Sequence, residues 1–246
     1  MMLGARTGAW AQSGGGGEWT NPYITDGLVA MWDGEWNVGG GKHDASAEVW
    51  KDLAGNIDLT VRYTPIWGDR FCTMQGPGNG WMSDRDFCSL IPNMLAGNGG
   101  AIEVVTGAIV GSSHNRIVTS FKDTSCAIRQ NCIDAGRVGF SIVFNGYNVG
   151  NTYDTRPLKS SATAVSNAGV WTIIHHAGGV DYSDSRGSVT YPVSNAMKVA
   201  VGLRQNNVND GYYVGDIYCV RYYDRALTSQ EIASNYALDK ARFNLA

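Results

Sequence analysis

The sequence predicts an all-β protein, an antiparallel β-sandwich or jelly roll that ends in one C-terminal α-helix. Short segments rich in β-branched and aromatic residues recur along the chain, separated by turns that contain Gly and Pro. Helical segments do not alternate with these segments, which argues against a parallel α/β fold. One long segment near the end of the chain has the pattern of a capped amphipathic helix instead.

Roughly ten to twelve strands at short spacing are expected, as is typical of sandwiches and jelly rolls. The segment "VWKDLAGN", residues 49–56, is predicted to form a short turn of helix that ends at Gly55. The predicted strands lie within 26–37, 57–62, 69–75, 80–83, 101–110, 116–121, 126–130, 137–144, 170–178, 198–204 and 215–224.

The helix prediction for 228–243 is supported by capping signals at its start. Thr228 occupies the N-cap position and Glu231 the N3 position, which together make a capping box. Leu227 and Ile232 have the spacing of a hydrophobic staple. Ile232, Tyr236 and Phe243 recur at helical spacing, so one side of the helix should pack on the sandwich.

Composition and charge disfavour two classes of partner. The 246 residues carry a net charge of −3, and no run of Lys or Arg exceeds two residues. Nucleic-acid binding through a basic stripe is therefore not expected. No stretch approaches the length of apolar sequence that spans a membrane. The first residues lack the apolar run of a signal peptide, so we expect synthesis in a cytoplasm.

The sequence suggests two unequal parts. Residues 1–19 comprise a short apolar segment and a Gly-rich linker, "SGGGGE", and residues 20–246 form one domain. A tethered apolar segment is typical of a docking tail, although a frayed terminus fits the same composition.

Both ends of the domain resemble a known family. "GLVAMWDGEWN" (27–37), followed by "EVWKDLAGN" (48–56), resembles the opening of laminin-G-like, concanavalin A-like jelly-roll domains. "GDIYCVRYYDRALTSQEIASNYALDKARF" (215–243) resembles the closing strand of that superfamily and the residues that follow it. The resemblance implies two packed antiparallel sheets, with residues 27–32 beside residues 215–223.

A narrower resemblance concerns the start, "MMLGARTGAWA". With the linker and this domain, it is similar to small proteins encoded among the structural genes of tailed bacteriophages. This implies a virion surface or tail-associated protein, made in the host cytoplasm without a signal peptide. Residues 1–18 would dock it to other virion proteins. The sequence leaves its oligomeric state open.

The same superfamily includes glucanases, which place two acidic residues on one strand face. Glycoside hydrolysis needs such a pair of carboxylates. Glu103 stands alone in its predicted strand, and Asp216 has no acid at position 218. Asp33 and Glu35 are the best available pair, where a strand runs into a Gly-rich loop. A non-enzymatic protein is therefore the main prediction.

The histidines and cysteines point to no metal site. His175 and His176 are adjacent in a strand, so their side chains should point to opposite faces, one buried and one on the surface. The five cysteines include no C-x-x-C pair and are expected to be buried free thiols. A bridge between Cys126 and Cys132 is sterically feasible but has no other support.

Two loops, 145–156 and 204–213, combine Tyr, Asn and Asp, and a third, after residue 33, carries a tryptophan. Aromatic rings stack on sugars, while Asn and Asp bind hydroxyl groups. The same oxygen-rich loops are candidates for calcium, although ordinary turns have similar composition. The predicted ligand-binding residues are Trp36, Tyr147, Asn148, Tyr153, Asp154, Asn206, Asn207, Asp210 and Tyr212.

The main functional prediction is thus a non-enzymatic virion surface or tail-associated structural protein, for which host-surface polysaccharide is a candidate ligand. The alternatives are a glycoside hydrolase or a free carbohydrate-binding module of the same fold.

Overall fold

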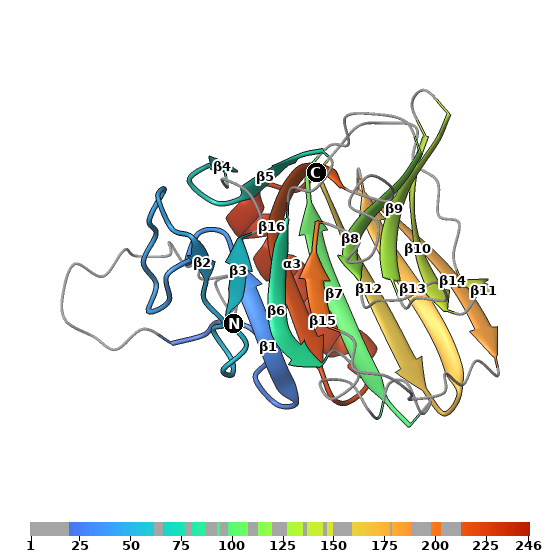
Figure 1. The fold of residues 1–246 in the computed structure, drawn as a ribbon. Helices are drawn as coiled ribbons and strands as arrows, with labels where there is room; N and C mark the ends of the chain where they lie inside the picture. Colours follow the sequence, from blue (N-terminus) through green and yellow to red (C-terminus); the bar gives the residue numbers. More distant parts are fainter. Residues whose placement is uncertain are drawn as a thin grey trace, which may run out of the picture.

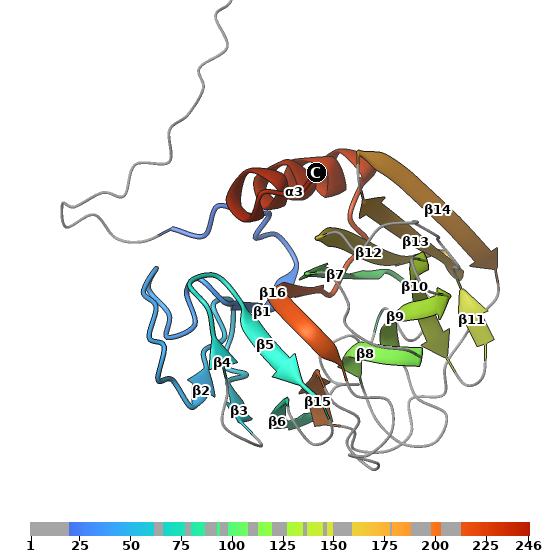
Figure 2. The same ribbon diagram turned by 90° about the horizontal axis from the view of Figure 1, so that it is seen from above.

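The protein has three layers: helix α3, sheet A and sheet B (Figures 1 and 2). In this computed structural model α3 lies on the outer face of sheet A, and sheet B covers the opposite face (Figure 2). The structure describes residues 20–61, 66–76, 80–86, 93, 98–107, 113–119, 127–134, 137–144, 147–149, 159–177, 179–187, 198–202 and 213–246.

Sheet A has the strand order β14-β13-β12-β7-β16-β5-β4, and β1 also pairs with β16. All of its strand pairs are antiparallel. Its strands are β1 (Leu28–Asp33), β4 (Ile66–Trp67), β5 (Cys72–Gln75), β7 (Gly100–Thr106), β12 (Ser160–Asn167), β13 (Val170–Ala177), β14 (Val180–Gly187) and β16 (Val214–Tyr223).

Sheet B has the order β11-β10-β9-β8-β15-β6-β3-β2 and is also antiparallel. Its strands are β2 (Val49–Trp50), β3 (Leu59–Val61), β6 (Trp81–Asp86), β8 (Ser113–Thr119), β9 (Ala127–Asp134), β10 (Arg137–Phe144), β11 (Tyr147–Val149) and β15 (Lys198–Val201). The antiparallel sandwich is confirmed, with more strands than expected.

The implied adjacency of the first and last strands is also confirmed. β1 pairs with β16 from Leu28↔Tyr223 to Asp33↔Cys219. The two motifs that carry the family resemblance therefore meet in the middle of sheet A.

Helix α3 (Ser229–Phe243) begins at the predicted cap. Thr228 Oγ1 accepts the Glu231 N–H over 3.3 Å, and the Glu231 carboxylate accepts the Thr228 N–H over 2.8 Å. Leu227 and Ile232 lie in the same buried cluster, in agreement with the predicted staple. Among the described residues, no helix has both the length and the apolar character needed to cross a membrane.

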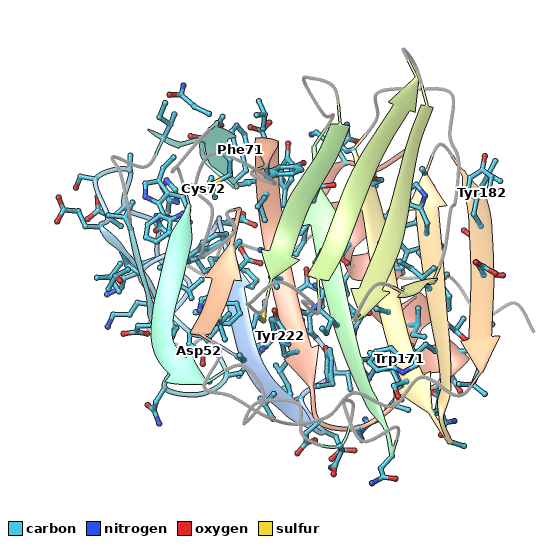
Figure 3. The ribbon with its side chains drawn as sticks, turned by 45° about the vertical axis from the view of Figure 1, so that its right-hand side comes forward. Asp52, Phe71, Cys72, Trp171, Tyr182 and Tyr222 are labelled. Carbon is cyan, nitrogen blue, oxygen red and sulfur yellow. The ribbon has the colours of Figure 1, made fainter. Side chains whose placement is uncertain are left out.

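Large aromatic residues fill the space between the sheets. Trp171 and Tyr222 lie between the two sheets (Figure 3), and the Tyr222 ring makes an edge contact with Trp32 at 5.7 Å. Trp50 and Trp81 are equally buried. Full burial of an apolar side chain contributes roughly 1.5–3 kcal/mol, so this group is a main source of the sandwich's stability.

The predicted helical turn at 49–56 is wrong. Val49 and Trp50 pair with β3 instead, and the turn after them is built around the carboxylate of Asp52. Oδ1 of Asp52 accepts the N–H groups of Met31 and Ala54 over 2.9 Å each, and Oδ2 accepts that of Ile57 over 3.1 Å. The Asp52 side chain thus binds the backbone of its own turn at Ala54 and joins the turn to β1 at Met31.

Cys72 and Cys219 are buried free thiols, as predicted. Two predictions fall on residues or side chains that the structure does not describe. They are the bridge between Cys126 and Cys132 and the docking segment 1–19.

Candidate functional site

The acidic pair Asp33 and Glu35 is bound to one arginine of α3. Arg242 donates from Nη1 to Asp33 Oδ2 over 2.7 Å and from Nη2 to Oδ1 over 3.0 Å. The same Nη2 lies 2.8 Å from Glu35 Oε2. Burial raises the pKa of Asp33, and the charge of Arg242 opposes this rise. A carboxylate held by a buried guanidinium is poorly placed to attack a substrate or transfer a proton.

A second buried network joins Glu103 to α3. Arg221 donates from Nε to Glu103 Oε2 and from Nη1 to Asp239 Oδ1, each over 2.8 Å. Asn235 donates to the same Glu103 oxygen over 2.8 Å, and Tyr23 donates to Asp239 Oδ1 over 2.7 Å. Burial raises the pKa of Glu103, against the charge of Arg221. Glu103 therefore anchors the helix on sheet A.

The prediction of one buried and one surface histidine is wrong, because both are buried. His175 is 0% exposed and His176 is 6% exposed. They do point to opposite faces: His175 lies near the Tyr182 ring, whereas the His176 ring stacks on Tyr236 of α3 at 4.0 Å. His176 Nδ1 also lies 2.6 Å from Asp181 Oδ1. The helix covers the face that the sequence pattern assigned to solvent.

Several predicted ligand loops leave sheet A from the same end. Ser160 and Ile217 both pair with Thr106, the last residue of β7. Asp33, the last residue of β1, pairs with Cys219 nearby. We call this end of sheet A the loop rim. It is defined by the four residues that lie just outside β1, β7, β12 and β16 at this end. They are Gly34, Gly107, Lys159 and Tyr213.

The register sets the spacing of the rim. Neighbouring strands lie about 4.8 Å apart. β7 separates β12 from β16, so these two strands lie roughly 10 Å apart. Tyr213 also lies three residues further along its strand than Lys159 does, which adds an offset of roughly 10 Å along the strands. This spacing is suitable for two loops that contact one sugar chain.

Hydrogen bonds fix the base of the rim. The Tyr213 N–H donates to Gly202 O over 2.9 Å, which closes the ends of the loop between them. The backbone oxygen of Asp216 accepts the Gly107 N–H over 2.8 Å, and its carboxylate accepts the Thr73 hydroxyl over 2.7 Å. The strand ends at the rim are therefore held together by hydrogen bonds.

Trp36 follows β1 at this rim and is half-buried. The guanidinium carbon of Arg242 lies 3.6 Å from the centre of its ring. Phe71, Tyr218 and Phe243 belong to the same apolar cluster, at the upper end of the sandwich where Figure 3 labels Phe71. Trp36 thus has a fixed orientation at the end of the sheet.

Tyr147 and Asn148 lie elsewhere, on β11 at the edge of sheet B. Tyr147 pairs with Phe144, at the end of β10 that lies away from the rim. β11 contacts β13 and β14, and half-buried Tyr182 lies on β14 at the same edge of the sandwich (Figure 3). The structure therefore offers the rim and this edge as two separate places for a ligand.

The other predicted ligand residues lie outside the described residues. They are Tyr153, Asp154, Asn206, Asn207, Asp210 and Tyr212. Within the described part of the chain, no group of three His, Cys, Asp or Glu side chains could hold a metal ion. Calcium binding by the two loops stays a prediction.

No pattern in the sequence indicated that the last turn of α3 contacts the rim. Arg242 reaches residues 33 and 35 across more than 200 positions of sequence. Lys159 donates from Nζ to the Phe243 backbone oxygen over 3.1 Å. Arg70 donates to the backbone oxygen of Arg242. A basic residue near a helix C-terminus is common, so no pattern distinguished these residues.

Comparison with known proteins finds similarity in fold but not in sequence. No protein-family model matches the chain, and no curated protein matches it.

Among solved structures, sialidase from Trypanosoma rangeli in complex with sialic acid superposes with a TM-score of 0.59 at 13% identity. The match covers 88% of this chain but 33% of the sialidase, so the chain spans about a third of that protein.

Domain 4 of AbnA, a GH43 extracellular arabinanase from Geobacillus stearothermophilus, was solved in complex with arabinotriose. It superposes with a TM-score of 0.57 at 17% identity, over 83% of this chain and 96% of that domain. This chain shares their β-sandwich fold. Neither comparison links it to a virus particle, so the virion role stays a prediction.

Proposed function

We propose that this chain is a non-catalytic carbohydrate-binding domain and that its ligand site is the loop rim. The observation that carries the proposal is the likeness to AbnA domain 4, a structure with bound arabinotriose. The likeness covers 96% of that domain, so the shared unit is a whole sandwich. This favours the predicted carbohydrate-binding module over the virion surface protein.

The chemistry of the rim supports the proposal. Trp36 supplies an indole ring, and the loops rooted at Lys159 and Tyr213 carry further Tyr, Asn and Asp side chains. Aromatic faces stack on the apolar faces of sugars, while amides and carboxylates bind their hydroxyl groups. A rigid base reduces the entropy lost when a ligand binds.

The environment of Asp33 and Glu103 favours binding over hydrolysis. Asp33 and Glu103 are both buried, and each accepts from an arginine. Glycoside hydrolysis requires two carboxyl groups that reach the scissile bond. These two stabilise the packing of α3, so we assign them no role in catalysis.

The test is calorimetric titration with arabinotriose, after a glycan array has covered other oligosaccharides. The Asn206→Ala, Asn207→Ala double variant should weaken binding about tenfold or more, because two amide hydrogen bonds are lost. Asn167→Ala is the matched control, since Asn167 is exposed at the far end of β12. It should bind as the wild type does.

Two results would contradict the proposal. One is the absence of binding to every glycan by folded protein. The other is release of reducing ends from a bound glycan, which would establish hydrolysis instead.

A further inference from the structure

The last turn of α3 contacts three segments that belong to or flank the loop rim. Arg242 binds Asp33 at the end of β1, Glu35 in the loop after it, and the face of Trp36. Arg70 comes from the loop between β4 and β5 and donates to the Arg242 backbone oxygen. Lys159 lies at the base of the β12 loop and donates to the Phe243 backbone oxygen. A single helix end therefore joins loops that are far apart in sequence.

These contacts supply hydrogen-bond donors to the carbonyl groups at the C-terminal end of the helix. The last carbonyl groups of an α-helix have no partner inside it, and the helix dipole places partial negative charge there. Asn244, in the left-handed conformation, donates to Lys240 O. The carbonyl of Phe243 accepts from Lys159 of the rim instead, and the carbonyl of Arg242 accepts from Arg70, which flanks the rim. Hydrogen bonds thus join the helix end to the rim and to the segment beside it.

Arg242 has the geometry of a clamp on Trp36. Its guanidinium lies 3.6 Å from the centre of the indole ring while both nitrogens of the fork bind carboxylates. Arg242 is 9% exposed and its partner Asp33 is 0% exposed. A planar guanidinium can stack on a ring and bind a carboxylate with two bonds at once, which an ammonium group cannot do.

We propose that Arg242 is a positioning residue of the glycan site, which holds Trp36 at the loop rim as a stacking surface for a sugar ring. Lys159 and Arg70 hold the turn that carries Arg242. This inference rests on the proposed function. It assigns the C-terminal helix a role in ligand binding, in addition to covering sheet A.

The test uses three variants. Arg242→Lys keeps the charge beside Asp33 but loses the planar fork. Lys159→Met removes one anchor of the helix end without leaving a buried charge unpaired. Lys240→Met is the matched control, because Lys240 lies in the same turn of α3 and is exposed.

Glycan affinity and the emission of Trp36 are measured in each variant. The Trp36 contribution is obtained by subtracting the spectrum of the same protein with Trp36→Phe. Arg242→Lys should bind glycan about tenfold more weakly and shift the Trp36 emission to the red, because the ring loses its cover. Lys159→Met should weaken binding several-fold, and Lys240→Met should change neither quantity.

Affinity within twofold of wild type in both Arg242→Lys and Lys159→Met would overturn the proposal. If Arg242→Lys fails to fold, Lys159→Met decides by the same criterion. If the wild type binds no glycan, the proposed function fails. The claim that Arg242 holds Trp36 is then decided by emission alone: a red shift in Arg242→Lys but not in Lys240→Met supports it, and an unchanged spectrum overturns it.

Discussion

At the scale of single residues, this protein places several ionisable groups where water does not reach. Asp33, Glu103, Asp239 and Arg221 are each at most 2% exposed. Each carboxylate accepts from a guanidinium, and Asp239 also accepts from a tyrosine hydroxyl. Such networks are costly to desolvate and costly to break. These networks explain why acidic residues that are candidates for catalysis in the sequence stabilise the fold in the structure.

His175 gives a prediction about pH. Burial, and then the neighbouring charge of His176, lower its pKa to about 3. The unfolded chain binds a proton here near pH 6.5, and the folded chain does not until about pH 3. Stability from this group is therefore full above pH 6.5 and falls as the pH drops toward 3, by up to about 1.4 kcal/mol per pH unit.

His175→Phe keeps an aromatic ring beside Tyr182 and removes the titration. Urea unfolding of wild type and variant between pH 7 and pH 4 checks the prediction. The variant should show a shallower loss of stability with falling pH. Equal slopes in the two proteins would show that His175 is not the group responsible.

At the scale of elements, Arg221 is one of the residues that attach α3 to sheet A. Arg221→Met should cost about 3–5 kcal/mol, because Glu103 and Asp239 would lose their shared charge partner in a buried place. Chemical denaturation measures the loss. Adding Glu103→Gln and Asp239→Asn should recover much of it, since neutral amides carry no unpaired charge. A single variant that costs less than about 1 kcal/mol, as exposed ion pairs do, would contradict this account.

The elements also show which parts of the fold the sequence could reveal. The helix, its cap and the pairing of β1 with β16 were predictable, because local chemistry and two motifs specify them. β12 was not, since "SSATAVSN" has small and polar residues on both faces. These fit because sheet B covers one face and α3 the other. β14, "VDYSDSRG", is equally polar because it lies at the edge of sheet A.

The candidate site was predictable only in part. Trp36 and the loops rooted at Lys159 and Tyr213 were found by composition, and strand register places their bases at one end of sheet A. Tyr147 and Asn148 had the same composition, but lie on β11 at another edge. Arg242 was missed because its contacts join residues more than 200 positions apart. Local sequence patterns do not predict contacts between residues that lie so far apart in the chain.

At the scale of the whole molecule, the two sheets and helix α3 create a rim where several strand ends share a rigid base. The sandwich resembles a domain solved with arabinotriose, yet a second aromatic region, Tyr182 beside β11, lies on the open edge. We propose that the rim, and not this edge, binds glycan.

Mapping amide chemical shifts during titration with the tightest-binding glycan separates the two regions most directly. If the rim binds the glycan, the largest changes should occur at Gly34, Trp36, Gly107, Lys159 and Tyr213, and β11 and β14 should be little affected. Changes confined to Tyr147–Val149 and Val180–Gly187 would contradict it.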